Sequence, residues 1–514
     1  MKNFFLLPDR NDGGSNFRLL FTVLVAAVFS KGVVLLRGFS IDDYSFANGV
    51  GEKELSLFFS QGRYLMALIF WVIESLGVNA GDLYFPLGIL VLILQSALVV
   101  SIFRFVGVER LPAAGLVGAL VVAHPYLTEI LTFRLVLASY CVALIFSILA
   151  LEALIRRPST WGGRAVALFA TLGMVFTYQV FLNYFAISIA FAFLLSLISK
   201  GDNNQAVVLA KRGREKAVDL TVVSVIAGFV FLAITGAARY YGVSGDVDRA
   251  KIIAQTDIPE RMSQMYSSLA NIYWLDEPVY SGWLKVLVAT VVVYSILIIL
   301  WKILLTGEEG GRRRNIFFSV LILIMLIPAS LGLIIAFKSW WPVPRVVAHV
   351  SVLFGLILLA ADFCFQSPRH GGVKFVVGAL RSVVLVGFIF LSNQILVDQQ
   401  RLNDWDRLMA NRIVSRLETI SSFENIKYIS INGGAWAFPR KLRTIQGDLN
   451  VSAFYPEHSK VSLLSEVSGY RLENADASGA ARGAEYCRGR QPWPHAESLA
   501  VFGDLAVICL KSIS

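Results

Sequence analysis

Charged residues are scarce in this sequence. Lysine, arginine, aspartate and glutamate make up 16% of the 514 residues, whereas soluble domains carry about a quarter. Hydrophobic residues make up 56%. This composition excludes an ordinary soluble protein and predicts a mainly α-helical, polytopic membrane protein. The net charge of +10 comes from short basic clusters between apolar runs, so it does not indicate binding to nucleic acid.

The sequence also lacks the motifs of nucleotide and metal chemistry. It has no Walker A loop, no GxGxxG and no GxSxG elbow. With four cysteines and five histidines, it contains no cluster with metal-ligand spacing. Asp246-Val247-Asp248 matches the DxD pattern of some metal-dependent sugar transferases, but it falls in an expected outer loop, where nucleotide sugars are absent. We therefore expect no metal and no cofactor.

Long apolar runs alternate with basic clusters along residues 1–397. The first run, 19–36, follows a basic N-terminus, and Lys31 lies near its outer end, where the amine is expected to snorkel to the surface. Residues 64–78 form a shorter run that Glu74 interrupts, which favours a surface helix over a span. The other expected spans are 83–103, 113–126, 135–155, 165–180, 184–198, 220–237, 283–305, 316–337, 346–363 and 375–397. This assignment gives about eleven spans, places every basic cluster in the cytoplasm, and puts the C-terminus outside.

Residues 398–514 contain no spanning run and form a second expected domain. The stretch 398–420 predicts a helix with one apolar face, while 426–431, 451–455 and 505–510 predict strands. We expect a small α+β domain on the periplasmic side. Cys487 and Cys509 lie in this tail, and an oxidising compartment would allow them to pair.

Acids, cations and aromatic residues gather on the expected outer face. Asp42 and Asp43 follow the first span, and Arg63 opens the surface helix. Other candidates at outer turns are Tyr44, His124, Glu129, Tyr178, Gln179, Lys338, Trp341 and Arg345. A carboxylate can deprotonate an acceptor hydroxyl, and cations can neutralise a phosphate leaving group. The set suits sugar transfer from a lipid phosphate; the alternative is that the acids are solvated loop residues and the aromatics an interfacial belt.

Several short motifs resemble those of a known enzyme family. They are Ile41-Asp42-Asp43-Tyr44 after the first span, Gly62-Arg63-Tyr64-Leu65, His124-Pro125-Tyr126 followed by Glu129 and Phe133, and Pro344-Arg345. In their order and layout they resemble the GT-C class of membrane glycosyltransferases, and within it the GtrII-like family of O-antigen glucosyltransferases.

This resemblance implies an inverting enzyme in the bacterial inner membrane with a periplasmic active site. Such enzymes take glucose from undecaprenyl-phosphate glucose and add it to lipid-linked O-antigen, which modifies lipopolysaccharide and converts serotype. A donor synthase and a donor flippase would be partners, together with membrane lipid. Asp42 or Asp43 would be the base, with Asp42 preferred as the first acid past the helix.

The resemblance also assigns the remaining candidates. Arg63 and Arg345 would bind the donor phosphate or pair with an acid, and Lys338 would be a further phosphate-binding candidate. The residues expected to bind sugar are Tyr44, His124, Glu129, Tyr178, Gln179 and Trp341. For His124, the alternative is a helix-end histidine with a backbone partner.

Two other classes of membrane protein compete with this interpretation. An O-antigen polymerase or ligase would also have outer cationic sites, but it would not need a tandem acid after the first span. A transporter or flippase predicts charges at mid-membrane and repeat symmetry. The spans are nearly free of such charges and no repeat is visible, which counts against transport.

Overall fold

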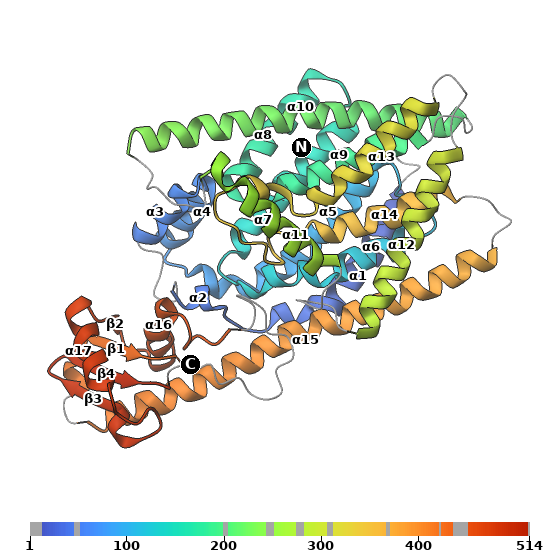
Figure 1. Ribbon diagram of the computed structural model, residues 1–514. Helices are drawn as coiled ribbons and strands as arrows, with labels where there is room; N and C mark the ends of the chain where they lie inside the picture. The colour runs from blue at the N-terminus through green and yellow to red at the C-terminus, as the bar shows by residue number, and fades with distance from the viewer. Residues whose placement is uncertain are drawn as a thin grey trace.

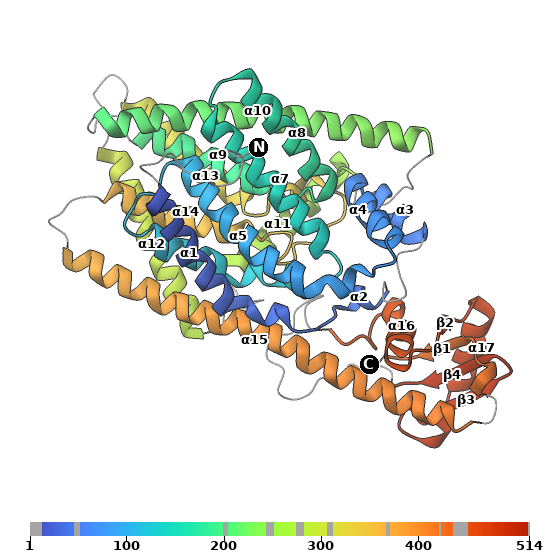
Figure 2. The ribbon, with the colours of Figure 1, turned by 180° about the vertical axis from the view of Figure 1, so that it is seen from behind.

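The computed structural model describes residues 13–45, 52–198, 204–242, 251–273, 282–305, 312–365, 371–420, 423–434 and 451–511. Most of these residues are helical, and the helices form a bundle with a small α/β tail domain attached at one end (Figures 1 and 2).

The apolar runs fold into the helices of the bundle. These are α1 (Gly13–Lys31), α5 (Tyr84–Val106), α6 (Ala114–Ala123), α7 (Leu137–Arg156), α8 (Trp161–Thr177), α9 (Phe181–Ile198), α10 (Asn204–Tyr240), α12 (Gly282–Leu305), α13 (Arg312–Ala329), α14 (Val350–Cys364) and α15 (Gly371–Glu418). Phe103, Leu120 and Phe185 are fully buried in their common core, while Phe169, Phe229 and Phe390 remain exposed on its outside. A bundle that is apolar both inside and outside is suited to a lipid surrounding.

Seven of the described helices are long and apolar enough to cross a membrane, or eight if the bent pair Ala114–Ala123 and Pro125–Thr132 is one span. Four further apolar helices are shorter: Tyr64–Ser75, Trp161–Thr177, Ile316–Ala329 and Val350–Cys364. The chain is therefore a helical membrane protein. The count of eleven would require three of the shorter helices to span as well, and it stays a prediction.

Short helices surround the acid pair between α1 and α5. They are η1 (Gly32–Leu35), α2 (Ile41–Ser45), α3 (Glu52–Ser60), α4 (Tyr64–Ser75) and η2 (Ala80–Leu83). The helix α4 corresponds to the short run expected at the surface. Its Met66 and Phe70 are buried against the protein, whereas Trp71 is exposed on the opposite side.

The helix after α14 is longer than expected. Residues 375–397 and 398–420 were predicted as a span followed by a separate helix, but α15 runs without interruption from Gly371 to Glu418 and carries the chain into the tail domain (Figure 1). The polarity changes at residue 398, but no proline or glycine follows that would end the helix. Residue 397 thus falls inside one helix.

The tail domain is a four-stranded sheet flanked by helices. The strands are β1 (Tyr428–Asn432), β2 (Glu473–Asn474), β3 (Leu499–Phe502) and β4 (Leu505–Cys509), in the order β2-β1-β4-β3. β1 pairs in parallel with β2 and β4, and β3 pairs antiparallel with β4. The helices are α16 (Glu457–Ser468) and α17 (Ala477–Cys487), and a disulfide joins Cys487 at the end of α17 to Cys509 in β4.

One expected strand of the tail is absent. Residues 451–455 were predicted as a strand but form an extended entry and a turn. The Asp406 carboxylate of α15 accepts hydrogen bonds from the Ser452 hydroxyl (2.6 Å) and the Ala453 amide (2.7 Å). These bonds fasten the segment to α15 in place of a neighbouring strand.

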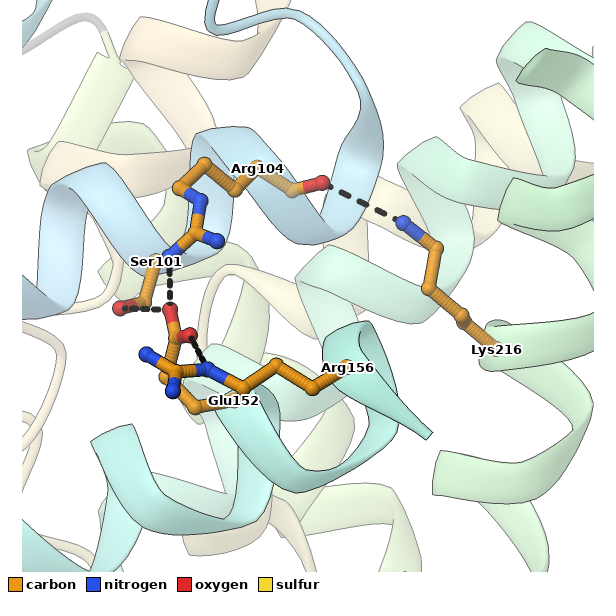
Figure 3. Close-up of polar contacts among 5 residues, drawn as sticks. All are labelled: Ser101, Arg104, Glu152, Arg156 and Lys216. Atoms are coloured by element: carbon orange, nitrogen blue, oxygen red, sulfur yellow. Dashed lines mark hydrogen bonds and ion pairs between the residues drawn. The ribbon is translucent and has the colours of Figure 1, made fainter. Parts of the chain in front are cut away.

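Basic residues cluster at the other end of the bundle, where α5 and α7 finish. Figure 3 shows Glu152 of α7 bridging Arg104 of α5 (2.5 Å) and Arg156 (3.2 Å). The Lys216 amine donates to the carbonyl of Arg104 (3.2 Å). Arg104 is 20 residues past Tyr84, the first residue of α5, so this cluster lies about 30 Å along the helix axis from the end of α5 that is near Asp43.

Candidate functional site

Asp43 is buried and bonded to the backbone on two sides. Its carboxylate accepts the amide hydrogens of Ser40 (2.7 Å), Arg134 (3.0 Å) and Leu135 (3.0 Å). The Asp43 amide donates in return to the Ser40 hydroxyl (3.2 Å), which completes a reciprocal N-terminal capping box for α2. Burial raises the pKa of Asp43 to about 6, against the lowering effect of its backbone donors and the Arg134 guanidinium.

Asp42 faces the other way. Its side chain is 50% exposed, and its Oδ1 lies 3.4 Å from Nε2 of His458 in α16 of the tail domain. The two neighbouring acids therefore have different surroundings: Asp43 ties the loop to the bundle, and Asp42 reaches solvent at the junction with the tail.

Residues 36–45, which include Asp42 and Asp43, are called the acid loop, and residues 124–135 connect it to the rest of the bundle. After α6 the chain bends by 54° into η3 (Pro125–Leu127) and η4 (Glu129–Thr132). Asp43 holds the end of this segment, as described above. α15 holds its middle, since Thr128 bonds Ser392 (3.0 Å) and the Gln399 amide donates to the Thr132 carbonyl (2.8 Å).

Glu129 and Arg345 form a buried ion pair at this segment. The Arg345 guanidinium bonds one carboxylate oxygen of Glu129, and the Arg345 amide donates to the other at 2.5 Å. Glu129 is 1% exposed. The guanidinium also stacks on Phe133, 4.4 Å from the ring centroid. The structure thus brings together two of the predicted site residues from opposite halves of the chain.

Arg134 is a second buried cation of this region. It is 1% exposed and bonds the Leu131 carbonyl through Nη1. Its Nε and Nη2 have no hydrogen-bond partner within the part of the chain that the structure describes. Burial lowers the pKa of Arg134 to about 10, although the nearby Asp43 carboxylate raises it.

Arg63, Tyr178 and Gln179 form another group. The Arg63 guanidinium lies 5.2 Å from the centroid of the Tyr178 ring, and its Nε donates to the Gln179 amide oxygen at 3.4 Å. The Gln179 amide nitrogen in turn donates to the carbonyl of Gln61 (3.2 Å). Arg63 precedes α4, so these contacts fix the short surface helix to the turn between α8 and α9.

Lys338 and Trp341 lie on the segment after η7 (Gly332–Ala336). Arg261 of α11 (Ile258–Tyr273) donates to the carbonyl of Lys338 (2.8 Å) and stacks on Trp340 at 4.5 Å. Trp341 is 42% exposed. This group therefore presents an aromatic surface to the surroundings.

Two of the predicted sugar-binding residues are buried in packing positions. Tyr44 is 1% exposed and belongs to the apolar core of the tail domain. His124 is also 1% exposed; its Nδ1 accepts the amide hydrogen of Tyr126 (3.2 Å), which caps η3, and its ring contacts Phe354 and Phe388.

A polar cavity of about 130 Å³ lies beside Asp43. Asn79 and Asp82 line it from the bundle, and Glu466 of α16 lines it from the tail. Arg37 crosses the junction and pairs with Glu466 at 2.6 Å. A cavity of roughly 150 Å³ holds a benzene molecule, so this one has room for a group no larger than that.

No group of three or more His, Cys, Asp or Glu side chains in the described residues could hold a metal ion. The Asp246-Val247-Asp248 motif lies outside those residues.

Sequence reasoning overlooked His458, Glu466 and the structural role of Asp43. The role of Asp43 has a local signal, because Ser40 and Asp43 have the S-x-x-D spacing of a capping box. The two tail residues have no such signal, since they meet the acid loop only through the folding of α15 and the tail.

Comparison with known proteins identifies the family. The model of the glucosyl transferase GtrII family matches residues 33–360, well over half of the chain. No curated protein matches the chain at a significant level. The matched region begins just before the acid loop and contains Asp42, Asp43, Arg63, Glu129 and Arg345. The chain belongs to the GtrII glucosyltransferase family.

Proposed function

We propose that this protein transfers glucose, or a similar hexose, from a polyprenyl phosphate to a lipid-linked glycan such as O-antigen at the outer face of the bacterial inner membrane. Membership of a glucosyltransferase family supports the reaction class. The helical membrane fold supports a lipid-borne donor, because such a donor reaches its enzyme through the bilayer.

Asp42 is the general base in this proposal. The observation that carries the assignment is the contrast between the two acids. The Asp43 carboxylate already accepts three backbone hydrogen bonds, whereas the Asp42 side chain is half exposed. A base must reach the acceptor hydroxyl, so Asp42 is the catalytic residue and Asp43 positions the loop.

The reaction is a single displacement. The Asp42 carboxylate takes the proton of the acceptor hydroxyl while the hydroxyl oxygen bonds to C1 of the donor glucose. The bond from C1 to the phosphate oxygen breaks, and polyprenyl phosphate leaves with its negative charge. Arg345 and Arg63 neutralise that charge, with Lys338 as a further donor-side cation.

The polar cavity beside Asp43 suits the hydroxyl-bearing edge of one acceptor sugar, because a whole hexose is larger than this space. It lies next to the acid loop and is lined by Asn79, Asp82 and Glu466, whose amide and carboxylates can bond sugar hydroxyls. Tyr178, Gln179 and Trp341 supply stacking and polar groups on the donor side.

The distribution of charge supports the proposed orientation of the protein. Arg104, Arg156 and Lys216 gather at the end of the bundle away from the acid loop. Because basic residues favour the cytoplasmic side, this distribution supports an acid loop and a tail domain on the periplasmic side in this proposal.

The test uses purified protein, radiolabelled polyprenyl-phosphate glucose and a lipid-linked glycan acceptor. Asp42→Asn is expected to lower kcat by about 10²- to 10⁴-fold, the usual contribution of a general base, without changing the unfolding temperature. Asp43→Asn replaces one acceptor oxygen by an NH₂ donor, which would face a backbone N–H. It is expected to reduce stability by about 1–3 kcal/mol while the folded fraction keeps measurable transfer.

Two results would contradict the proposal. If the wild type transfers no label from any polyprenyl-phosphate hexose, the reaction is wrong, and a polymerase, ligase or transporter becomes the leading alternative. If the wild type transfers label and Asp42→Asn does so equally well, the base has been assigned to the wrong residue.

A further inference from the structure

The acid loop contacts the tail domain at three points. Arg37 pairs with Glu466 (2.6 Å), Asp42 with His458 (3.4 Å), and Tyr44 is buried in the tail core. Both His458 and Glu466 lie on α16, so one helix of the tail domain contacts the loop at Arg37 and at Asp42. The family match ends at residue 360, which places α16 outside the region that defines the family.

The backbone on both sides of the Asp42–His458 contact is firmly held. On the loop side, the capping box and the bonds from Asp43 to Arg134 and Leu135 fix the residue after Asp42. On the tail side, the Ser459 hydroxyl donates to the Ala453 carbonyl (2.7 Å) and the Lys460 amine donates to the Gly433 carbonyl (2.8 Å). Ser459 and Lys460 are almost fully buried.

We propose that His458 is a positioning residue for Asp42, so that the tail domain completes the active site of the bundle. Nε2 of the imidazole lies 3.4 Å from Oδ1 of Asp42, and an N–H at this position would favour the carboxylate orientation in which the other oxygen meets the acceptor hydroxyl. A carboxylate on an exposed loop otherwise samples several rotamers, and only some of them are productive. This inference rests on the proposed function of Asp42 as base.

The test compares three substitutions of His458 in the full-length protein. His458→Ala removes the ring, His458→Phe keeps a ring without a donor, and His458→Gln keeps an N–H donor at a similar reach. Loss of a hydrogen bond to a charged group corresponds to about a 10- to 100-fold effect. We expect that decrease in kcat for Ala and Phe, recovery to within a few-fold of wild type for Gln, and little change in the KM for the polyprenyl-phosphate donor.

Asn403→Ala provides the matched control. It removes the two hydrogen bonds by which α15 holds the same loop, from the Phe39 amide to the Asn403 side-chain oxygen (2.7 Å) and from the Asn403 side-chain nitrogen to the Phe39 carbonyl (2.9 Å), without touching Asp42. If His458 only helps to hold the loop in place, Asn403→Ala will lower kcat as much as His458→Ala, and the proposal fails. It also fails if Ala and Phe match the wild type, or if Gln is as slow as Ala.

The wild type and Asp42→Asn distinguish a failure of the role of His458 from a failure of the proposed function. A wild-type protein that transfers nothing refutes the proposed function. A wild type that transfers, is disabled by Asp42→Asn and is indifferent to His458→Ala and His458→Phe refutes only the role of His458.

Discussion

Glu129 and Arg345 form a buried ion pair at the candidate site. Both partners are largely buried, and the pair joins the segment after the helix break to the residues that lead into α14. Breaking a buried pair from one side costs about 3–5 kcal/mol, because the other charge stays buried without its partner. We expect Glu129→Gln and Arg345→Gln each to lower the free energy of unfolding in detergent by that amount.

The double variant distinguishes pairing from packing. The double variant Glu129→Gln/Arg345→Gln should lower the free energy of unfolding by less than the sum of the two single changes, because neither charge is left buried without its partner. The exposed pair of Arg490 and Glu497, 3.4 Å apart in the tail, is the control: Glu497→Gln should change stability by less than about 1 kcal/mol. Additive losses at Glu129 and Arg345 would show that the pair contributes no coupling.

At the scale of one element, the break after α6 depends on a buried lysine. Lys31 was expected to snorkel to the surface, but it is 0% exposed, and its amine donates to the carbonyls of Val122 (2.5 Å) and His124 (3.4 Å). The Ser392 hydroxyl bonds the carbonyl of Ala123 between them (2.9 Å). The last carbonyls of a helix have no partner within it and carry partial negative charge. A cation from α1 therefore satisfies them where the chain bends.

Lys31→Met is expected to destabilise the bundle by about 1–3 kcal/mol, the cost of a buried acceptor that loses its donor. Thermal unfolding in detergent measures this. Ser30→Ala is the control on the adjacent residue, because within the described part of the chain the Ser30 hydroxyl bonds carbonyls of its own helix, those of Ala26 and Ala27. Equal stabilities of Lys31→Met and Ser30→Ala would refute the capping role.

At the scale of the whole molecule, the sequence predicts the local features and misses the long-range contacts. Apolar periodicity predicted the helices, and the two adjacent acids indicated the loop that also lies in the region matched by the family. The sequence could not show that Asp42 contacts His458, because the two residues are separated by nearly the entire chain. Their contact depends on how α15 carries the tail domain back to the loop (Figure 2). The alternation of apolar and polar residues did not predict the turn at residues 451–455 either, because the hydrogen bonds of one side chain of α15, Asp406, determine it.

The disulfide of the tail offers a test of how the whole molecule sits in the membrane. Cys487 and Cys509 are bonded to each other, while Cys141 and Cys364 of the bundle are not part of that disulfide. Disulfides persist in the periplasm and are rare in the reducing cytoplasm. If the tail is periplasmic, protein that is denatured directly from cells should react with a thiol reagent at Cys141 and Cys364 alone, and at all four cysteines after reduction.

The orientation proposal depends on that result. Four labelled cysteines before reduction would put the tail, and with it the Asp42 loop, on the cytoplasmic side, where the proposed donor is not expected.

The double variant Cys487→Ser/Cys509→Ser supplies the complementary measurement. The bond closes a loop of 22 residues, so its removal should cost the tail about 3 kcal/mol. Because α16 belongs to the same domain and carries His458, transfer by this variant should become heat-sensitive at temperatures that leave the bundle folded.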